Sequence, residues 1–312
     1  MSGRPSLRHR PVIALTGATG FVGQAVLDAA VDAGFSIRAL TRRTQPERPH
    51  VEWIGGELGN AASLVELVGG AEAVIHVAGV VNAPDAAAFE EGNVTGTLNL
   101  VEAAVRMGVR RFVHVSSLSA REPDLSAYGA SKARAEKIVM ASPLDWTIVR
   151  PPAIYGPRDK EMFELFRAAR WGFIPMPREG RASMIHVEDL ARLLVALEPG
   201  GLAVTGKVFE PDDGKPQGWE HFELGLAIGW AMGRRPRVIG LSPSMLERSA
   251  RIDGFFRGSR AKMTLDRAAY FSHPDWVVSP EAAPPATLWR PRVETREGLK
   301  ATAQWYREHK WL

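Results

Sequence analysis

A chain of 312 residues with 45% apolar and 24% charged side chains has the make-up of an ordinary globular protein, which excludes a protein disordered throughout. The absence of cysteine excludes disulfides, thiolate zinc sites and a cysteine nucleophile, and no stretch approaches the roughly 18 consecutive apolar residues of a transmembrane helix. The net charge of +4 is compatible with nucleic acid, an anionic surface or a phosphorylated small molecule as partner, and does not choose among them.

The first ten residues are basic. Arg4, Arg8 and Arg10 precede an apolar run at 11–15, an order that resembles a secretory signal. The glycine spacing after this run favours a first β-strand instead. We therefore expect residues 1–10 to be a disordered basic tail and the protein to be cytoplasmic.

From Val12 to Arg150, short β-branched runs alternate with amphipathic segments of helical length. This alternation is typical of βαβ units, and the nearly all-apolar strands indicate that helices cover both faces of a parallel sheet. We therefore predict an α/β fold with a Rossmann-type doubly wound parallel sheet. The expected strands are 12–16, 36–41, 50–54, 73–78, 111–116 and 145–149, and the expected helices are about 21–34, 60–68, 86–107 and 127–141.

After Arg150 prolines interrupt this rhythm, and seven of the nine tryptophans lie at or beyond Trp171. Residues 185–189, which run into an apolar helix ending near Leu197, predict one more strand and helix that return to the sheet. We expect residues 11–160 plus about 183–200 to form a dinucleotide-binding domain. The smaller C-terminal substrate-binding lobe would comprise about 161–182 plus 201–312.

A glycine-rich turn joins the first expected strand to the first expected helix. Its G-x-x-G-x-x-G spacing allows a sharp turn and the close approach of a pyrophosphate, whose charge would meet the free N–H groups of the helix. An ordinary βα turn is the alternative, and the flanking strand and helix favour the nucleotide. Over about residues 11–198 the chain resembles the short-chain dehydrogenase/reductase superfamily, in particular its extended and atypical branches, the NAD-dependent epimerase/dehydratase-like family. The loop residues expected to contact a cofactor are Gly17, Thr19, Gly20, Phe21, Val22 and Gly23.

The second expected strand ends in Arg42 and Arg43, without the acid that would bind an adenosine 2′-hydroxyl. Guanidinium groups bind phosphate oxygens, so the pair favours NADP(H) over NAD(H), with Arg38 as possible help. A solvated basic turn is the alternative interpretation.

The resemblance implies further cofactor contacts. Glu57 and Leu58 follow the third strand where the family has an acid and an aliphatic residue beside adenine, and Ala78 and Gly79 match its fourth-strand turn. The loop after Arg150 resembles a family motif near the nicotinamide, with Tyr155 and the later His186 expected to be structural. The contacts carried over in this way are Glu57, Leu58, Ala78, Gly79, Ser116, Tyr128, Lys132, Pro151, Ala153 and Ile154.

A Tyr-x-x-x-Lys pair follows the fifth strand. Tyr128 and Lys132 would share one face of a helix, and a protonated lysine lowers the pKa of a nearby tyrosine toward the working pH of a general acid/base. Tyr306 and Lys310 have the same spacing, so the spacing alone is weak evidence. The resemblance implies Ser117 as substrate-binding hydroxyl, Tyr128 as acid/base, Lys132 as its modulator and Asn93 as a possible relay.

The two residues after Ser117 narrow the choice of reaction. Dehydratases of the extended branch have Asp-Glu there, whereas this chain has Leu118 and Ser119. We therefore expect an NADP(H)-dependent reductase of a small-molecule ketone or aldehyde, with no metal and a possible homodimer, the latter a family-level expectation. The alternatives are a sugar-nucleotide epimerase-like enzyme and a non-catalytic NADP-binding accessory or redox-sensor protein.

The charge excess is concentrated in one stretch. Residues 234–267 hold nine basic and three acidic side chains, a net +6. Such a stretch could bind a phosphorylated substrate, an acidic partner or a lipid surface, and the alternative is a solvated helical face. No nucleic-acid-binding module is recognisable, so nucleic acid is not expected as a partner.

Overall fold

The computed structural model describes residues 10–258 and 261–312. The tail expected at 1–10 therefore lies, apart from Arg10, outside the described residues. Within the described part, seven parallel strands form one sheet in the order β11-β6-β5-β4-β1-β2-β3. These strands are β1 (Val12–Thr16), β2 (Ser36–Thr41), β3 (Val51–Gly55), β4 (Ala73–His76), β5 (Arg111–Val115), β6 (Asp145–Val149) and β11 (Lys207–Phe209).

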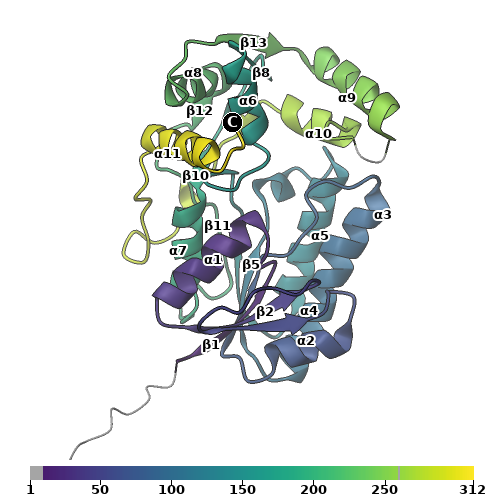
Figure 1. Cartoon of the computed structure of the whole chain (residues 1–312). Coiled ribbons are helices and arrows are strands. Elements are labelled where there is room, and N and C mark those ends of the chain that lie inside the picture. The colour runs from purple at the N-terminus through teal and green to yellow at the C-terminus, as the bar shows by residue number, and fades with distance from the viewer. Residues whose placement is uncertain (1–9, 259–260) are drawn as a thin grey trace, which may run out of the picture.

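Helices cover both faces of this sheet (Figure 1). In β1, Ile13 and Leu15 pack toward α1 and α7, whereas Ala14 packs toward α2, α4 and α5. This alternation is expected of a strand buried on both faces. The covering helices are α1 (Phe21–Asp32), α2 (Ala61–Val68), α4 (Gly96–Arg106), α5 (Ala127–Ala141) and α7 (Val187–Ala196).

The order of the strands confirms the predicted doubly wound α/β fold. The chain reverses direction across the sheet between β1 and β4, and such folds bind ligands at this switch point, beyond the carboxyl ends of the strands. The expected helix at 86–107 is divided, because α3 (Ala86–Phe89) passes through a π-helical segment at Glu90–Thr95 before α4 begins.

The chain after β6 differs from the expected arrangement in two strands. Residues Met184–His186 form β10, which pairs with β7 (Ala153–Tyr155) and not with the main sheet. The seventh strand is instead β11, within the segment assigned to the lobe from the sequence. Its three residues follow Gly206 and are too short to show a periodic pattern, which is why the sequence did not reveal them.

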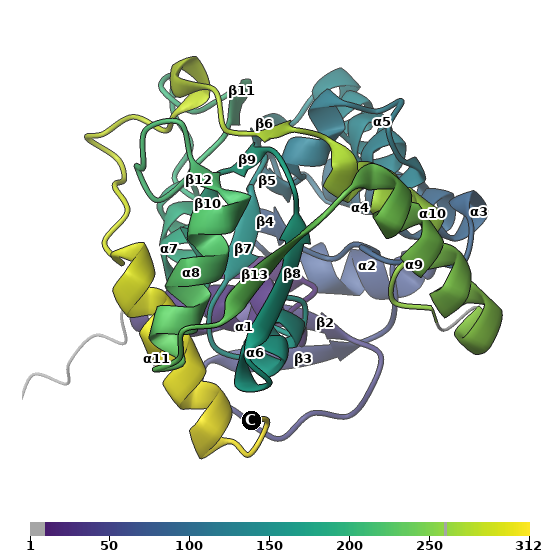
Figure 2. The same cartoon turned by 90° about the horizontal axis from the view of Figure 1, so that it is seen from above.

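The remaining segments form a lobe above the carboxyl ends of the strands (Figures 1 and 2). It is built on two small sheets, one pairing β8 with β13 and one in the order β12-β9-β14. Its elements are α6 (Phe163–Arg170), β8 (Phe173–Pro177), β9 (Arg181–Ala182), β12 (Trp219–Glu220), α8 (His221–Ala231), β13 (Arg237–Leu241), α9 (Pro243–Arg257), α10 (Leu265–Ser272), β14 (Asp275–Trp276) and α11 (Thr295–Glu308). Among the described helices, none combines the length and apolarity needed to cross a membrane.

Candidate active site

The glycine loop lies between β1 and α1 and allows very little added volume. Gly17 has φ +74°, and a Cβ there would lie 2.7 Å from the backbone nitrogen of Ala78. A Cβ on Gly23 would lie 1.9 Å from the Gly17 carbonyl oxygen. Gly20 precedes α1, and no side chain caps the helix, so its first N–H groups remain available to an anion. The loop therefore fits the pyrophosphate of a dinucleotide.

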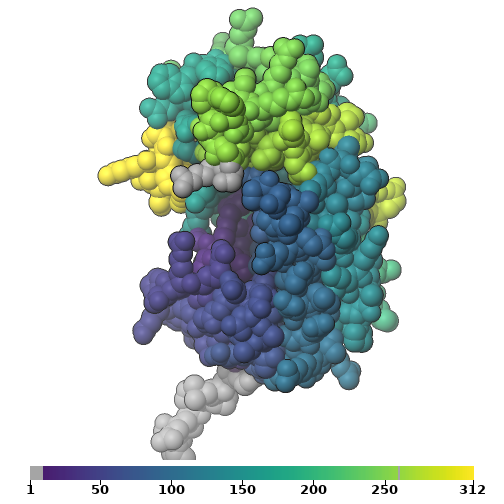
Figure 3. Space-filling view, turned by 90° about the vertical axis from the view of Figure 1, so that its right-hand side faces the viewer, coloured from purple at the N-terminus to yellow at the C-terminus, as the bar shows by residue number. Residues whose placement is uncertain are grey.

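This loop lies beside a visible hollow. Figure 3 shows the hollow with N-terminal residues (purple) at its floor and part of the lobe (green) above it. A nucleotide on the glycine loop would lie in this hollow.

Arg42 and Arg43 follow β2 with exposed side chains, and neither guanidinium pairs with an acid within residues 10–258 and 261–312. Thr41 fixes the turn locally, since its hydroxyl donates to the Arg43 carbonyl oxygen at 2.7 Å. Arg38, in contrast, pairs with Glu52 at 3.0 Å and donates to the Gly69 carbonyl. Arg38 is therefore committed to the fold and is not available to help Arg42 and Arg43.

The turn after β4 is held by a network around His76. Thr97 donates to the Asn93 carbonyl at 2.6 Å, so the His76 Nε2–H must donate to the Thr97 oxygen, 3.0 Å away. The His76 Nδ1 then accepts from the Thr16 hydroxyl at 2.7 Å, and Thr16 accepts from the Ala78 N–H. Burial lowers the pKa of His76 to about 3, with Lys132 adding to the effect. A neutral histidine thus fixes Ala78 against the glycine loop.

The adenine end of the expected site is formed by Leu58, whose carbonyl accepts from Asn99 at 2.9 Å. A Cβ on Gly96 would lie 2.8 Å from the Leu58 side chain, so a glycine is needed beneath it. Glu57 is exposed next to it.

Tyr128 and Lys132 are close together on the N-terminal part of α5, as expected from their spacing. Burial raises the pKa of Tyr128, and a hydrogen bond with the Ser117 hydroxyl offsets part of that rise. Burial lowers the pKa of Lys132 to about 8, against the opposing charge of Glu136. The Lys132 ammonium donates to the Val115 carbonyl at 2.8 Å. The tyrosine pKa therefore shifts upward, opposite to the expected direction, because burial of the phenol dominates.

Ser117 is oriented by a second serine that the sequence pattern did not single out as functional. The Ser119 N–H and hydroxyl both donate to the Ser117 oxygen, at 3.2 and 3.0 Å. The Ser117 proton is left to point toward Tyr128 or a substrate oxygen. The sequence signal that could have identified Ser119 is its hydroxyl, two residues after that of Ser117.

Asn93, the expected relay, lies in the π-helical segment with its amide engaged. It accepts from the Val80 N–H at 2.7 Å and donates to the Val80 carbonyl and the Ser131 hydroxyl, both at 2.9 Å. It therefore ties the loop after β4 to α5, and its relay role stays a prediction.

Ser116 is directed into the fold and not into the hollow. Its hydroxyl donates to Glu136, which pairs with Arg150 at 2.6 Å. Arg150 also reaches Glu210 at 3.5 Å, so a buried ionic network links α5 to the end of β6. The Ser116 side chain is thus structural in this arrangement, and a cofactor contact would have to come from its backbone.

The loop after β6 lies next to Ser117. Pro151 accepts from the Leu118 N–H at 3.0 Å, and Ala153 and Ile154 follow it in β7 with partly buried side chains. Tyr155 is fully buried, and its ring lies edge-on to His186 with centroids 5.2 Å apart.

Tyr306, which shares the Tyr-x-x-x-Lys spacing, is buried in the lobe. Its hydroxyl donates to the Asp159 carbonyl at 2.6 Å. The second pair therefore lies away from the site.

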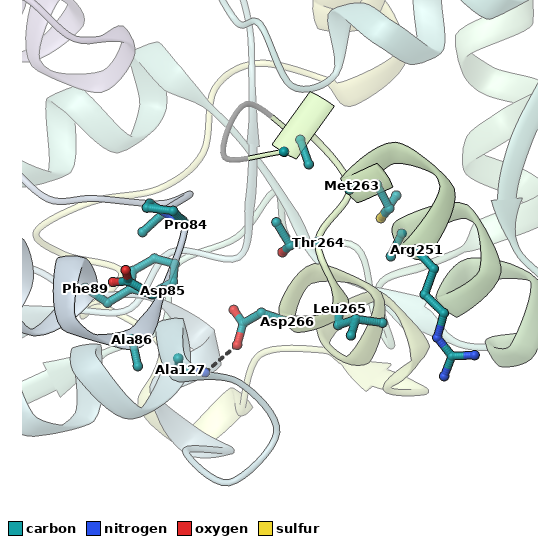
Figure 4. Close-up of a pocket in the computed structure, with 15 residues that line it drawn as sticks. Pro84, Asp85, Ala86, Phe89, Ala127, Arg251, Met263, Thr264, Leu265 and Asp266 are labelled. Carbon is teal, nitrogen blue, oxygen red and sulfur yellow. Dashed lines mark hydrogen bonds between the residues drawn. The ribbon is translucent and has the colours of Figure 1, made fainter. Parts of the chain in front are cut away.

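A cavity of about 440 Å³ lies next to the N-terminal end of α5, where Ala127 lines it. Figure 4 shows its two walls, with α3 and the start of α5 on one side and the α9–α10 segment on the other. Phe89 lines the cavity, and its ring centroid is 5.9 Å from that of Tyr128. Asp266 of α10 accepts from the Ala127 N–H at 2.5 Å, at the first residue of the helix that carries Tyr128 and Lys132. No pattern in the sequence predicted this contact, which joins the lobe directly to α5, the helix that carries Tyr128 and Lys132.

A doubly wound sheet with a glycine loop and a Ser-Tyr-Lys set at the ends of its strands defines an NAD(P)-dependent oxidoreductase fold and site. Comparison with known proteins agrees. The model of the NAD(P)H-binding family matches residues 17–197. The chain is 39% identical to ceramide reductase of Caulobacter vibrioides over 97% of this chain and 96% of that protein. It is 31% identical to 2-alkyl-3-oxoalkanoate reductase of Stenotrophomonas maltophilia over 65% of this chain and 71% of that protein.

Solved structures place the fold in the same group. MoeE5 in complex with UDP-glucuronic acid and NAD superposes with a TM-score of 0.73 at 24% identity, covering 96% of this chain and 99% of that one. The chain belongs to the extended short-chain dehydrogenase/reductase family of NAD(P)-binding enzymes. The predicted family, fold class and enzyme class are confirmed.

Proposed function

We propose that this enzyme uses NADPH to reduce the ketone of a long-chain lipid to a secondary alcohol. The observation that carries the proposal is the Ser117–Tyr128–Lys132 set together with the cavity of about 440 Å³, which is lined by Phe89 and Ala127, two neighbours of Tyr128. A phenol whose pKa is raised remains protonated at neutral pH and can donate its proton.

Each residue has one role in this reaction. Bound NADPH supplies the hydride that reaches the carbonyl carbon. The Ser117 hydroxyl, oriented by Ser119, donates a hydrogen bond to the carbonyl oxygen and stabilises the negative charge that develops there. Tyr128 transfers its proton to that oxygen, which completes the alcohol. The Lys132 ammonium, next to the resulting phenolate, stabilises its charge.

The glycine loop, Leu58 and the turn at Ala78 would hold the dinucleotide. Arg42 and Arg43 support NADPH over NADH, because two exposed guanidiniums without acidic partners suit a 2′-phosphate. Cells keep NADP largely reduced, so this preference favours net reduction over an epimerisation that returns the hydride.

The substrate class rests on the relative and on the cavity. Ceramide reductase is similar along almost the whole chain, and reduction of a ketone yields the secondary hydroxyl that a ceramide carries. The cavity wall includes Phe89, Met263 and Leu265, which suit an aliphatic chain. We expect the enzyme to work in the cytoplasm, where its reductant is regenerated.

A homodimer is part of the proposal. Leu98 and Val105 on α4 and Met140 on α5 are exposed apolar side chains on helices next to each other in the fold. Burial of these side chains between two copies would give the homodimer expected from the family.

The test is NADPH oxidation by the full-length enzyme with a ceramide oxidised to the ketone at its secondary hydroxyl, followed by identification of the alcohol. Tyr128→Phe should lower kcat by about a thousandfold while NADPH binding stays unchanged. Retained turnover in this variant would overturn the mechanism. A large thermal shift with NADPH but no oxidation across ketones and aldehydes would favour a sensor.

A further inference from the structure

Exposed apolar side chains gather at the outer end of the lobe. This end is formed by α8, β13 and α9, which Figure 1 places opposite β1 and β2 and which Figure 2 shows running across the molecule. Phe222, Leu226 and Trp230 are exposed on α8 at intervals of four residues, so they share one helix face. Isolated exposed apolar residues are ordinary, but a row on one face marks a surface that binds something.

The last turns of α9 are the most exposed part of this end. Phe255 is 85% exposed and Phe256 78%, with Ile252 one turn before them. The inner face of α9 buries only Leu246 and Ala250. The helix thus places large apolar side chains outward that its own fold does not use.

Exposed basic side chains occur on the same elements. Arg234 and Arg235 are exposed on the turn between α8 and β13, Arg237 at the start of β13, and Arg248 on α9. Some of the basic excess is locally paired, as in the 3.2 Å contact of Arg257 with Asp253. Exposed pairs of this kind are weak and do not prevent contact with a phosphate.

The α9 part of this surface adjoins the cavity. Phe255 follows Gly254, which lines the cavity, and it lies one helical turn beyond Arg251, which lines it too. On the opposite wall, Phe89 contacts both the cavity and the Tyr128 ring. A long apolar molecule leaving a membrane at the α9 tip would therefore enter a space lined by Phe89 and Ala127, two neighbours of Tyr128.

We propose that the outer end of the lobe docks on a lipid bilayer that contains anionic headgroups. Phe255 and Phe256 insert among the lipids, the arginines contact headgroup phosphates, and the ketone lipid passes from the bilayer into the cavity. The role in substrate delivery rests on the proposed function. A second copy of the chain fits this surface poorly, because a two-fold interface would bring Arg248 and other exposed arginines of the two copies together.

The test is co-sedimentation of the full-length protein with vesicles of equal parts phosphatidylglycerol and phosphatidylcholine, and with vesicles of phosphatidylcholine alone. The wild type should bind the anionic vesicles more tightly. The double variant Phe255→Ser/Phe256→Ser should bind at least about tenfold more weakly. Arg248→Gln should weaken binding about fivefold on anionic vesicles alone. The matched control is Leu202→Ser, which removes a 99% exposed leucine from the loop before β11 and should bind like the wild type.

Two results would overturn the docking surface. One is vesicle binding by the double variant equal to that of the wild type, or no binding by either. The other is light scattering in which the double variant turns a dimer into a monomer, since the surface would then join two copies.

The vesicle assay needs no turnover, so it is independent of the proposed reaction. If vesicle binding follows the expected pattern but no ketone is reduced, the reductase proposal fails and the docking surface stands. If the docking surface fails alone, reduction of a water-soluble short-chain ketone persists. That reaction should be equal in the wild type and in the double variant.

Discussion

The α9–α10 segment lies across the cavity from α3 and the start of α5, and it is packed far less well than the sheet that α5 covers. The sheet is packed on both faces by two continuous clusters of buried side chains. The α9–α10 segment has a cluster of three buried residues, Leu246, Ala250 and Ala268, and leaves Phe255 and Phe256 exposed. In the proposed reaction, Tyr128 and Lys132 therefore lie on a helix packed against the sheet, whereas the α9–α10 wall of the cavity has few buried contacts.

The two parts are joined by a few polar contacts. Asp266 accepts from Ala127 at the start of α5, and Asn82, in the loop after β4, donates to the Ala261 carbonyl at 3.4 Å. The cavity wall on the lobe side can therefore shift while the proton donor stays in place.

We expect low pH to destabilise the sheet before the lobe. His76 and His114 are buried side by side, with ring centroids 5.2 Å apart, and burial lowers both pKa values. A lowered histidine pKa means that the unfolded chain binds the proton more tightly, so stability is full above pH 6.5 and falls as the pH drops toward 3. We expect a loss of about 5 kcal/mol from His76 alone, measured by urea unfolding at several pH values.

His114→Phe provides the control for this acid effect. Neither His114 ring nitrogen has a hydrogen-bond partner within the described residues, so an apolar ring of similar shape should be tolerated. The pH slope of the unfolding free energy should fall by about one proton. An unchanged slope would show that His114 does not titrate on unfolding.

Gly17→Ala should lower the free energy of unfolding by about 3 kcal/mol or more. The new Cβ meets the Ala78 backbone at 2.7 Å, and φ +74° is strained for any other residue. Thermal unfolding and NADPH titration should both show the loss. Gly34→Ala is the matched control, because Gly34 also has positive φ, +94°, but nothing lies near its added Cβ. Equal loss in both variants would mean that backbone strain alone matters.

The double variant Arg42→Ala/Arg43→Ala tests the exposed turn after β2. Losing two guanidiniums should weaken NADPH binding by about ten- to a hundredfold and leave NADH binding and stability nearly unchanged. The measurement is the Kd of each cofactor by fluorescence titration. Equal weakening of both cofactors would contradict a 2′-phosphate contact, and Arg48→Ala, which breaks a pair with Asp28, serves as control.

Asp266→Asn tests the contact between α10 and α5. It should have the smallest effect on stability, about 1 kcal/mol. The α5 helix keeps its Ser126 cap, so the catalytic helix stays folded. We expect KM for the lipid ketone to rise with little change in kcat. An equal fall in kcat would instead show that the contact positions Tyr128.

The sheet could be predicted because its signals are local. Apolar runs, the glycine loop and the serine at the end of β5 each lie within a few residues, and together they separate Tyr128 from Tyr306. The cavity wall could not be predicted, because Asp266 meets Ala127 from 139 residues away along the chain. The count of basic residues at 234–267 was correct, but only the structure shows that Lys262 and Arg267 pair with acids on α6 and just before it.

The π-helical segment at Glu90–Thr95 has a consequence for how this enzyme can change. It separates α3, which lines the cavity through Ala86 and Phe89, from α4, whose Leu100 and Ala104 are buried against the sheet. A wider turn absorbs an added or lost residue that would otherwise rotate every later side chain by about 100°. The wall facing the substrate can therefore vary in length across evolution while the core of the sheet keeps its register.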